Sequence, residues 1–469
     1  MKKFFRCFSH LQEVKDSHIS FFRSILPSTS IETEDLSTYT SDWLKVHKGS
    51  SKLVLKPTTT DQVSEILKYC NLERLGLVPQ SGNTSQVGGA VPVQNEIILS
   101  MKNLNKILDL DDIQGIVWCE AGVILENLMK FVGKKGWMIP LDLGSKGSCM
   151  IGGNVATNAG GLRYIRYGSL NGNVLGLEVV IPSGEILSDL KALRKDNTGL
   201  NLKQLFIGSE GILGVITKVA LLLPPKPSSM QLAFLGCTSY EKVVKALTSA
   251  KASLGEILSA FEFIDSQTME IILKRIPRTR YPLASPHNFY ILIETSGSHS
   301  ESDKEKMEHF LESAVESNLI TDGVVAQDTS QSENFWRIRE GGLLALRQEA
   351  VDLHQFDFSL RIPEMYNFVE VVREKVGNAG KVTAYGHVGD GNLHMYVLGD
   401  GKNNLENLIY PFLYEEIERR NGSISAEHGI GLFKQGLIGY TKSETNIKYM
   451  KAVKDVFDPR GIMNPFKIF

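Results

Sequence analysis

Short apolar runs alternate with amphipathic stretches over most of this chain. Between residues 52 and 225, strand-sized apolar runs occur at 53–55, 77–78, 97–99, 116–119 and 179–181. Such runs predict short β-strands. Helices are expected after residue 57, with Thr60 or Asp61 as the N-cap, and over 125–132. Mixed helices and strands with short connections predict an α+β domain that ends at about residue 225, where Pro224, Pro225 and Pro227 follow one another closely.

From Gln231 the same kind of pattern predicts a second, layered α+β domain. Strands are expected at 232–236 and 288–294, and helices at 241–252, 303–317 and 364–376. A polar loop is expected at 296–302, and a final helix over 438–457. Together these elements predict four segments: an N-terminal extension with a leading helix over 1–44, a cofactor domain over 45–228, a substrate or cap domain over 229–425, and a segment over 426–469 that completes the active site.

Composition narrows the class of protein. The chain has 469 residues, enough for two or three domains, and 42% of them are hydrophobic. Its net charge of −2 argues against a nucleic-acid partner. No apolar run approaches the roughly 20 residues that span a bilayer. The five cysteines are scattered without CxxC spacing, which suits a reducing compartment.

The first eleven residues carry three basic side chains and no acidic one, with Phe and Leu between them. This composition is typical of a mitochondrial presequence. The stretch is short and poor in Arg and Ser, so a frayed tail is the alternative interpretation. We therefore expect a mitochondrial protein, or otherwise a cytoplasmic one.

Two glycine-rich loops predict a site for a phosphate-bearing cofactor. They run from Pro79 to Gly89 and from Ile151 to Gly161, and each contains Asn and Thr beside its glycines. Glycine lets backbone N–H groups approach a ligand closely and form anion-binding nests. Neither loop is G-x-G-x-x-G after a strand, and no G-x-x-x-x-G-K-[ST] is present, which disfavours NAD and ATP.

A second group of motifs predicts a metal site. Asp390-Gly391 is a strong two-residue hairpin signal, and a turn there would place His387 directly opposite His394. Glu427 is the expected third ligand. Two histidines and one carboxylate leave positions open for substrate, which is the catalytic arrangement of zinc, although iron and manganese accept the same ligands.

His428 follows Glu427 directly and is the expected base, because histidine can take up a proton near neutral pH. A cofactor cradle, a metal and a base together predict redox chemistry on a small acid.

These motifs resemble those of the flavoprotein family that includes vanillyl-alcohol oxidase and p-cresol methylhydroxylase. The similarity rests on both glycine-rich loops and on Phe206–Gly214, and it covers residues 45–469. It implies a two-part FAD-binding domain, an α+β cap domain, and a C-terminal helical segment that returns to the flavin. No histidine lies in the first loop, so the FAD is expected to be noncovalent. The FAD-binding residues it implies are Gly82, Asn83, Thr84, Gly88, Gly89, Pro140, Gly144, Ser145, Ile151, Gly152, Gly153, Asn154, Thr157, Asn158, Gly161, Glu210, Gly214, Ile216 and Asn464.

Within that family the chain is most similar to the FAD-linked D-2-hydroxyacid dehydrogenases, above all those that oxidise D-2-hydroxyglutarate. The resemblance implies His387, His394 and Glu427 as metal ligands and Arg339 as the clamp for a substrate carboxylate, a role suited to a guanidinium. It also shows departures. Ser81 stands where glycine is usual, and Leu343, Gln355 and Tyr396 stand where Thr, Lys and Asn line the substrate pocket.

The expected reaction is oxidation of a D-2-hydroxy acid, first of all D-2-hydroxyglutarate, to the 2-oxo acid, with hydride transfer to FAD. Electrons are expected to pass to a flavoprotein or quinone carrier, and a homodimer is left open. The alternatives are a D-lactate or other D-2-hydroxyacid dehydrogenase, a non-redox transferase of the alkyl-dihydroxyacetone-phosphate synthase type, and a catalytically inactive flavoprotein that only binds partners.

Overall fold

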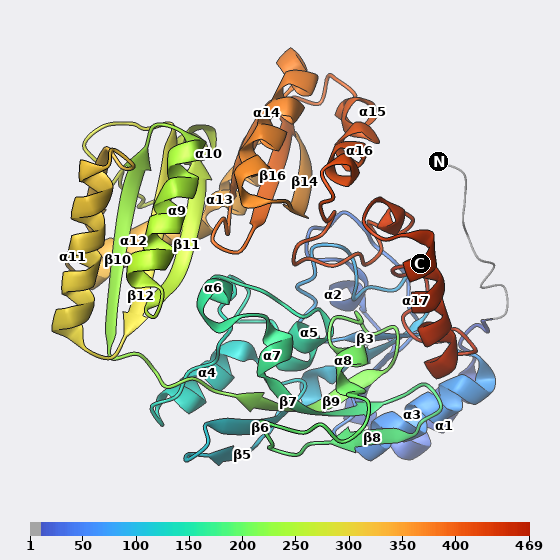
Figure 1. Ribbon diagram of the computed structural model, residues 1–469. Helices are drawn as coiled ribbons and strands as arrows, with labels where there is room; N and C mark the ends of the chain where they lie inside the picture. The colour runs from blue at the N-terminus through green and yellow to red at the C-terminus, as the bar shows by residue number, and fades with distance from the viewer. Residues whose placement is uncertain (1–10) are drawn as a thin grey trace. The chain divides into compact units, whose positions relative to one another are not determined.

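The computed structural model describes residues 11–469, which divide into two compact units (Figure 1). The first comprises the residues up to Gly160, Ser169–Lys226 and His428–Phe469; the second comprises Gly161–Gly168 and Pro227–Glu427. Each unit is therefore built from segments that are not contiguous in the sequence. The predicted presequence falls on residues 1–11, and residues 1–10 lie outside the described part of the chain.

The first unit contains two sheets. A four-stranded sheet has the order β1-β2-β4-β3, in which β2, β3 and β4 are parallel. A five-stranded antiparallel sheet has the order β5-β6-β9-β7-β8. The strands are β1 (Ile31–Glu32), β2 (Val54–Leu55), β3 (Leu77–Gln80), β4 (Ile97–Ser100), β5 (Ile107–Asp111), β6 (Ile116–Glu120), β7 (Val174–Val180), β8 (Ile186–Asp189) and β9 (Val215–Leu222).

Helices complete this unit, and one continuous apolar core joins them to the sheets. The helices are α1 (Asp16–Ile25), α2 (Ser37–Thr40), α3 (Thr60–Glu73), α4 (Leu125–Gly133), α5 (Ile151–Ala156), α7 (Leu170–Asn173), α8 (Lys203–Phe206) and α17 (Glu444–Phe457). The cap of α3 is Thr59, whose side chain accepts from the Gln62 N–H, so the prediction of Thr60 or Asp61 was wrong by one or two residues. The predicted helix over 438–457 was also too long, because Ser443 caps α17 and a short 3₁₀ turn occupies Ile438–Tyr440.

The C-terminal tail returns to the strand that precedes the first glycine-rich loop. The Leu77 N–H donates to the Ile462 carbonyl at 2.8 Å, and the Asn464 N–H donates to the Leu77 carbonyl at 2.7 Å. Both partners are main-chain groups, so the tail extends the edge of the sheet at β3. The predicted return of the C-terminal segment to the cofactor domain is confirmed.

The second unit is built on one antiparallel sheet of seven strands, in the order β13-β10-β12-β11-β15-β16-β14. Its strands are β10 (Ser229–Cys237), β11 (Leu258–Asp265), β12 (Phe289–Gly297), β13 (Asp322–Val325), β14 (Asp352–Ser359), β15 (Lys381–Gly386) and β16 (Asn392–Gly399). Strands β11 and β16 are buried along their whole length, which means that both faces of the sheet are covered there.

Helices cover both faces of this sheet. The helices α9 (Tyr240–Leu254) and α11 (Ser300–Glu316) pack together and against β10 and β12. A separate apolar cluster joins residues of α10 (Ser266–Arg275), α12 (Thr329–Glu340) and α13 (Gly342–Glu349) to β10, β12, β15 and β16. Three short helices and one long one complete the unit: α6 (Tyr164–Tyr167), α14 (Met365–Val376), α15 (Leu405–Ile409) and α16 (Phe412–Arg419). The loop predicted at 296–302 is shorter, since β12 ends at Gly297 and α11 begins at Ser300.

Three further observations bear on function. None of the helices within residues 11–469 is long and apolar enough to cross a membrane. The four cysteines in this part of the chain are buried and form no disulfide.

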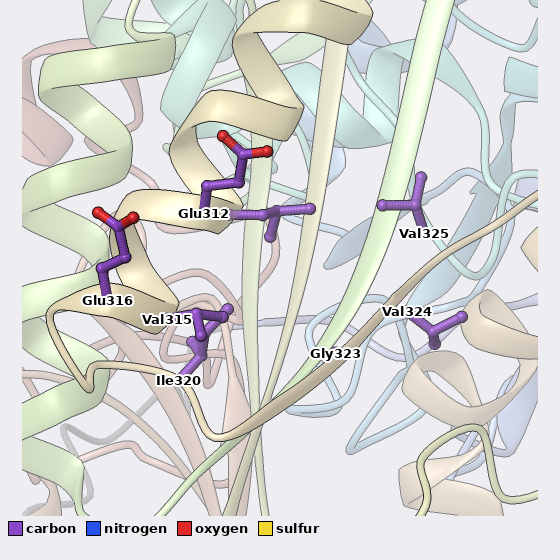
Figure 2. A pocket seen from close by; sticks show the side chains of 8 residues that line it. Glu312, Val315, Glu316, Ile320, Gly323, Val324 and Val325 are labelled. Carbon is purple, nitrogen blue, oxygen red and sulfur yellow. The ribbon is translucent and has the colours of Figure 1, made fainter.

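A pocket between α11 and the edge strand β13 is lined by aliphatic side chains, mainly valine, together with Glu312 and Glu316 (Figure 2). It contains none of the predicted site residues.

Candidate metal centre and cofactor cradle

The histidine motif spans a hairpin whose turn is longer than predicted. Strand β15 ends at Gly386 and β16 begins at Asn392, so residues 387–391 form the loop. The residue opposite His394 is Tyr385, not His387, and the predicted two-residue turn and its register are therefore wrong. The loop is tightened by N–H groups of Asp390 and Asn392, which both donate to the His387 carbonyl.

Despite the different register, the three predicted metal ligands meet. His387 Nε2 lies 3.7 Å from Glu427 Oε1, and His394 Nε2 lies 3.4 Å from the same oxygen. The two imidazole rings are nearly perpendicular, with centroids 5.4 Å apart. Both histidines are buried, and the Glu427 side chain is 18% exposed. Two imidazole nitrogens and a carboxylate oxygen therefore face one another, as a cation with three protein ligands requires.

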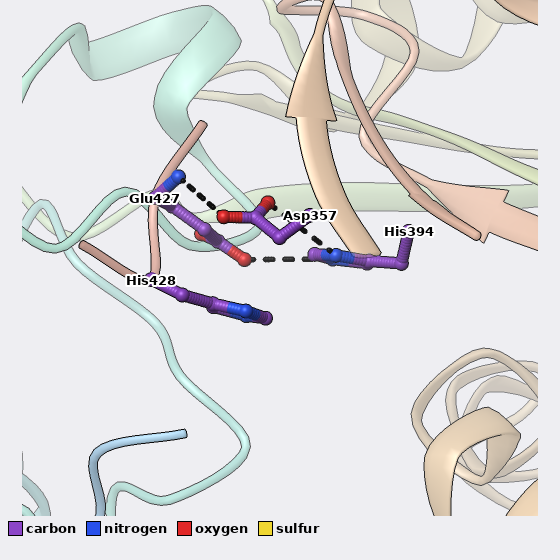
Figure 3. Close-up of side chains that lie close together, drawn as sticks. All are labelled: Asp357, His394, Glu427 and His428. Carbon is purple, nitrogen blue, oxygen red and sulfur yellow. Dashed lines mark hydrogen bonds and ion pairs between the residues drawn. The ribbon is translucent and has the colours of Figure 1, made fainter. Parts of the chain in front are cut away.

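Two buried carboxylates lie behind the histidines. Glu262 accepts from His387 Nδ1 at 2.9 Å, and Asp357 Oδ1 lies 3.7 Å from His394 Nδ1. Asp357 also accepts the Glu427 N–H at 3.0 Å. Asp357, His394 and Glu427 offer ligand atoms within 4.8 Å of one another (Figure 3). Because Asp357 contacts the ring nitrogen that faces away from Glu427 Oε1, we assign it to orienting His394 rather than to binding the ion.

The donor set fits a divalent cation. Burial opposes protonation of His387, but the neighbouring Glu262 carboxylate outweighs it and raises the pKa of His387 to about 10. Without a cation this imidazole therefore carries a proton, which a bound cation would displace. A buried site with two imidazoles, a carboxylate and a carboxylate partner on each histidine has the composition of catalytic zinc sites.

His428 follows Glu427 directly, and Figure 3 draws its imidazole beside the other three side chains. The next turn of chain is fixed by Glu210, whose carboxylate accepts the Ile430 and Gly431 N–H groups at 2.8 and 2.7 Å. Glu210 was predicted to touch FAD. In the structure its carboxylate holds the loop that carries His428.

Arg339 lies on α12 and is 4% exposed. Its Nε donates to Glu262 at 2.6 Å, and its guanidinium lies over the face of Tyr385, 4.9 Å from the ring centre. Burial alone would raise the pKa of Glu262, yet Arg339 and His387 lower it, so the carboxylate stays ionised. Arg339 is thus held beside His387, one of the predicted metal ligands. Its predicted binding of a substrate carboxylate stays a prediction.

The three residues expected to depart from the hydroxyglutarate-type pattern lie on three different elements, Leu343 on α13, Gln355 on β14 and Tyr396 on β16. Tyr396 is 1% exposed, and its hydroxyl is 3.0 Å from that of Tyr385, with the two rings stacked. Gln355 lies directly opposite Tyr396 in the sheet. Burial raises the pKa of the Tyr385 hydroxyl, and the nearby Leu343 backbone opposes this shift. Tyr385 and Tyr396 therefore form a stacked pair, and the Arg339 guanidinium lies over the Tyr385 ring.

The two glycine-rich loops, apart from Gly161, lie in the first unit. A Cβ on Gly153 would come 2.9 Å from the Ser81 Cβ, so the loops touch at the position where Ser replaces the usual Gly. A side chain on Gly82 would collide with the Ser148 carbonyl at 2.2 Å, which explains the glycine there. The remaining predicted positions fall on the loops and strands around them: Thr84, Gly88, Gly89, Pro140, Gly144, Ser145, Ile151, Gly152, Gly214 and Ile216.

Several predicted FAD contacts already have partners within the protein. Asn83 Nδ2 donates to the Ser41 carbonyl, the Thr157 hydroxyl donates to the Gly153 carbonyl, and Asn158 Oδ1 accepts from the Ser169 hydroxyl. In contrast, Asn154 Oδ1 and Asn464 Oδ1 are buried and have no hydrogen-bond partner among residues 11–469. Buried polar atoms need partners, so these two amides from the second loop and the tail fit a bound cofactor.

Gly161 belongs to the second unit, with Glu427, rather than to the first. Its N–H donates to Glu427 Oε2 at 3.2 Å. The sequence predicted that Gly161 binds FAD and did not predict this contact. The carboxylates of Glu262 and Asp357 beside the histidines were also not predicted. An acidic residue inside an apolar strand, as in Phe261-Glu262-Phe263 and Phe356-Asp357-Phe358, was the available signal.

Comparison with known proteins agrees with this arrangement. Residues 51–189 match the family model of the FAD binding domain, and residues 226–468 match that of the C-terminal domain of FAD linked oxidases. The chain belongs to this family of FAD-linked oxidases, and the predicted family is confirmed.

Among curated proteins, the mitochondrial D-2-hydroxyglutarate dehydrogenase of Arabidopsis thaliana is 51% identical over 96% of this chain and 81% of its own length. The D-2-hydroxyglutarate–pyruvate transhydrogenase of Saccharomyces cerevisiae is 44% identical over 97% and 95%. Both relatives are named for reactions of D-2-hydroxyglutarate.

Solved structures show the same fold. p-Cresol methylhydroxylase aligns over 97% of this chain and 96% of its own with a TM-score of 0.76, at 18% identity. An alkyldihydroxyacetonephosphate synthase aligns over 97% and 85% with a TM-score of 0.74, at 17% identity. At these identities the likeness concerns the fold, which confirms the predicted fold class.

Proposed function

We propose that this protein is an FAD-dependent D-2-hydroxyacid dehydrogenase that oxidises D-2-hydroxyglutarate to the 2-oxo acid. The observation that carries the proposal is the convergence of His387 Nε2 and His394 Nε2 on Glu427 Oε1, in a chain that contains an FAD-binding domain. The relatives named for D-2-hydroxyglutarate support the choice of substrate.

In the proposed reaction His387, His394 and Glu427 hold a divalent cation, for which zinc is the first choice. Bound FAD supplies the hydride acceptor, and the bound cation supplies an electropositive site for the substrate carboxylate and 2-hydroxyl. His428 takes the hydroxyl proton as the hydride leaves C2. Arg339 binds a substrate carboxylate, and Glu262 and Tyr385 keep its guanidinium in place.

The direct test is oxidation of a panel of 2-hydroxy acids with an artificial electron acceptor. We expect turnover of D-2-hydroxyglutarate, slower or weaker use of D-lactate, and no use of the L-enantiomers. Absence of turnover with every D-2-hydroxy acid would overturn the proposal and favour an inactive flavoprotein. The transferase alternative shares only the fold, and it predicts no reduction of the flavin by any hydroxy acid.

The tyrosine pair beside Arg339 predicts an altered choice of substrate. Gln355→Lys restores a cation opposite Tyr396, and one charge-assisted hydrogen bond to a distal carboxylate is worth about a tenfold change in affinity. We therefore expect the KM for D-2-hydroxyglutarate to fall by about tenfold and that for D-lactate to stay nearly unchanged. Steady-state kinetics on both substrates provide the measurement. An equal change for both would show that position 355 does not face the distal carboxylate.

Noncovalent attachment of FAD is a further expectation. The loop from Pro79 to Gly89 contains no histidine or cysteine that could form a tether. The purified protein should be yellow, and acid precipitation should release all of the flavin into the supernatant. Flavin that remains in the pellet would contradict this prediction, whereas colourless protein would argue against the cofactor itself.

We place the reaction in mitochondria, because the plant relative is named mitochondrial. Two kinds of electron acceptor are proposed. One is an electron-carrying flavoprotein or quinone. The other is a 2-oxo acid, because the yeast relative is named a transhydrogenase with pyruvate. Anaerobic mixing of substrate-reduced protein with pyruvate distinguishes them, since reoxidation of the flavin by pyruvate alone requires no further carrier.

A further inference from the structure

One buried carboxylate contacts both a metal ligand and the substrate-binding arginine. Glu262 lies on β11 and is 1% exposed. Its Oε1 accepts from His387 Nδ1 at 2.9 Å, and its Oε2 accepts from Arg339 Nε at 2.6 Å. The Arg339 Nη2 is also 2.6 Å from Oε2. Both oxygens are therefore engaged, each by a residue with a different proposed role.

Each contact fixes one geometric property of the site. A hydrogen bond from Nδ1–H keeps the free electron pair of His387 on Nε2, the atom that faces Glu427. The bond to Nε and Nη2 holds one edge of the Arg339 guanidinium, while the Tyr385 face supports its plane. Among the described residues Nη1 of Arg339 has no partner in a hydrogen bond, so this nitrogen remains for a ligand.

Asp357 provides an internal comparison. It lies beside the other histidine, 3.7 Å from His394 Nδ1, and accepts from the Glu427 N–H and from Asn392 Nδ2. It thus contacts two of the three ligands, whereas the hydrogen bonds and ion pairs of Arg339 within residues 11–469 go to Glu262 and His387. The two carboxylates are similar in burial, at 1% and 2% exposed, and differ in what they connect.

We propose that Glu262 is a positioning residue that couples cation binding to recognition of the substrate carboxylate. Loss of its charge releases Arg339 and His387 together, whereas loss of the Asp357 charge affects the cation alone. This inference rests on the proposed metal site and on the role of Arg339. It adds a carboxylate 77 residues from the arginine in sequence and 125 residues from the histidine.

The test compares Glu262→Gln with Asp357→Asn in the FAD-loaded protein. Cation affinity is measured directly by titrating metal-free protein with Co²⁺ and following its absorption, and KM and kcat are measured on zinc-loaded protein. Mutation of such a partner weakens metal binding by about 10- to 100-fold. We expect this loss in both variants, and a raised KM for the hydroxy acid at saturating zinc only in Glu262→Gln. FAD content should be unchanged in both.

A second measurement tests whether Glu262 affects KM through its contact with Arg339. In an Arg339→Ala background, Glu262→Gln should no longer raise KM but should still weaken Co²⁺ binding. Glu262→Asp, which keeps the charge but withdraws it, should show the same two effects more weakly and serves if Glu262→Gln does not fold.

Equal KM values in Glu262→Gln and Asp357→Asn at saturating zinc would overturn the coupling. So would a Glu262→Gln protein with wild-type Co²⁺ affinity. A wild-type protein that binds no Co²⁺ at all would instead overturn the proposed metal site on which the inference rests.

Discussion

The His394→Ala variant is expected to keep its FAD but to lose its cation and at least about a hundredfold of its turnover. The reason lies in the geometry, because His394 Nε2 is one of two imidazole nitrogens within 3.7 Å of Glu427 Oε1 and its loss leaves two ligands. The residues predicted to bind FAD, apart from Gly161, belong to the other compact unit, so flavin content should not change. Metal analysis, flavin absorbance and kcat with D-2-hydroxyglutarate provide the three measurements.

His309→Ala is the matched control for this experiment, since His309 is an exposed histidine on α11. It should retain metal, flavin and turnover. Treatment of the wild-type protein with a chelator should reproduce the His394→Ala result, and added zinc should restore activity to the chelated wild type only. Full turnover by metal-free protein would refute a role for the cation.

The second large effect is expected at the base. His428→Asn should lower kcat by about 10²- to 10⁴-fold, the usual contribution of a positioned general base. Asparagine cannot take the hydroxyl proton, but His387, His394 and Glu427 remain, so zinc and FAD should stay bound. The rate of flavin reduction after rapid anaerobic mixing with substrate measures the affected step.

This variant also distinguishes two roles of His428, because its side chain lies beside Glu427 and could serve as a further ligand. Loss of zinc in His428→Asn would assign it to the cation, and retention of zinc with slow flavin reduction would assign it to proton transfer. An unchanged rate of reduction would remove His428 from the mechanism.

Local sequence patterns predicted the parts of this protein that depend on nearby residues. Apolar runs located β2, β3, β4 and β6, because a buried strand needs a short uninterrupted apolar segment. The Glu427-His428 pair and the two histidines of the hairpin could be selected as candidate site residues because these residue types are chemically distinctive even without a structure. Strands β11 and β15 were not predicted, since burial of both faces removes the alternating pattern that marks a strand.

The hairpin of β15 and β16 shows why the pairing register of two strands could not be predicted from the sequence. Asp390-Gly391 favours a two-residue turn, but the structure has a five-residue loop in which His387 and Gly391 flank the turn residues. In the observed loop, His387 Nδ1 is paired with the buried Glu262 carboxylate. A local turn preference is small beside the cost of burying an unpaired carboxylate.

What the sequence alone determined is the chemistry available to this protein: two glycine-rich loops, two histidines, Glu427-His428 and Arg339. What only the tertiary structure decided is how these groups are held. Glu262 and Asp357 reach their histidines across 125 and 37 residues of chain, and no local pattern predicts contacts at such separations. Buried carboxylates must find partners wherever the folded chain brings them, so the packing of the seven-stranded sheet, not the order of residues, selected which acids orient the metal ligands.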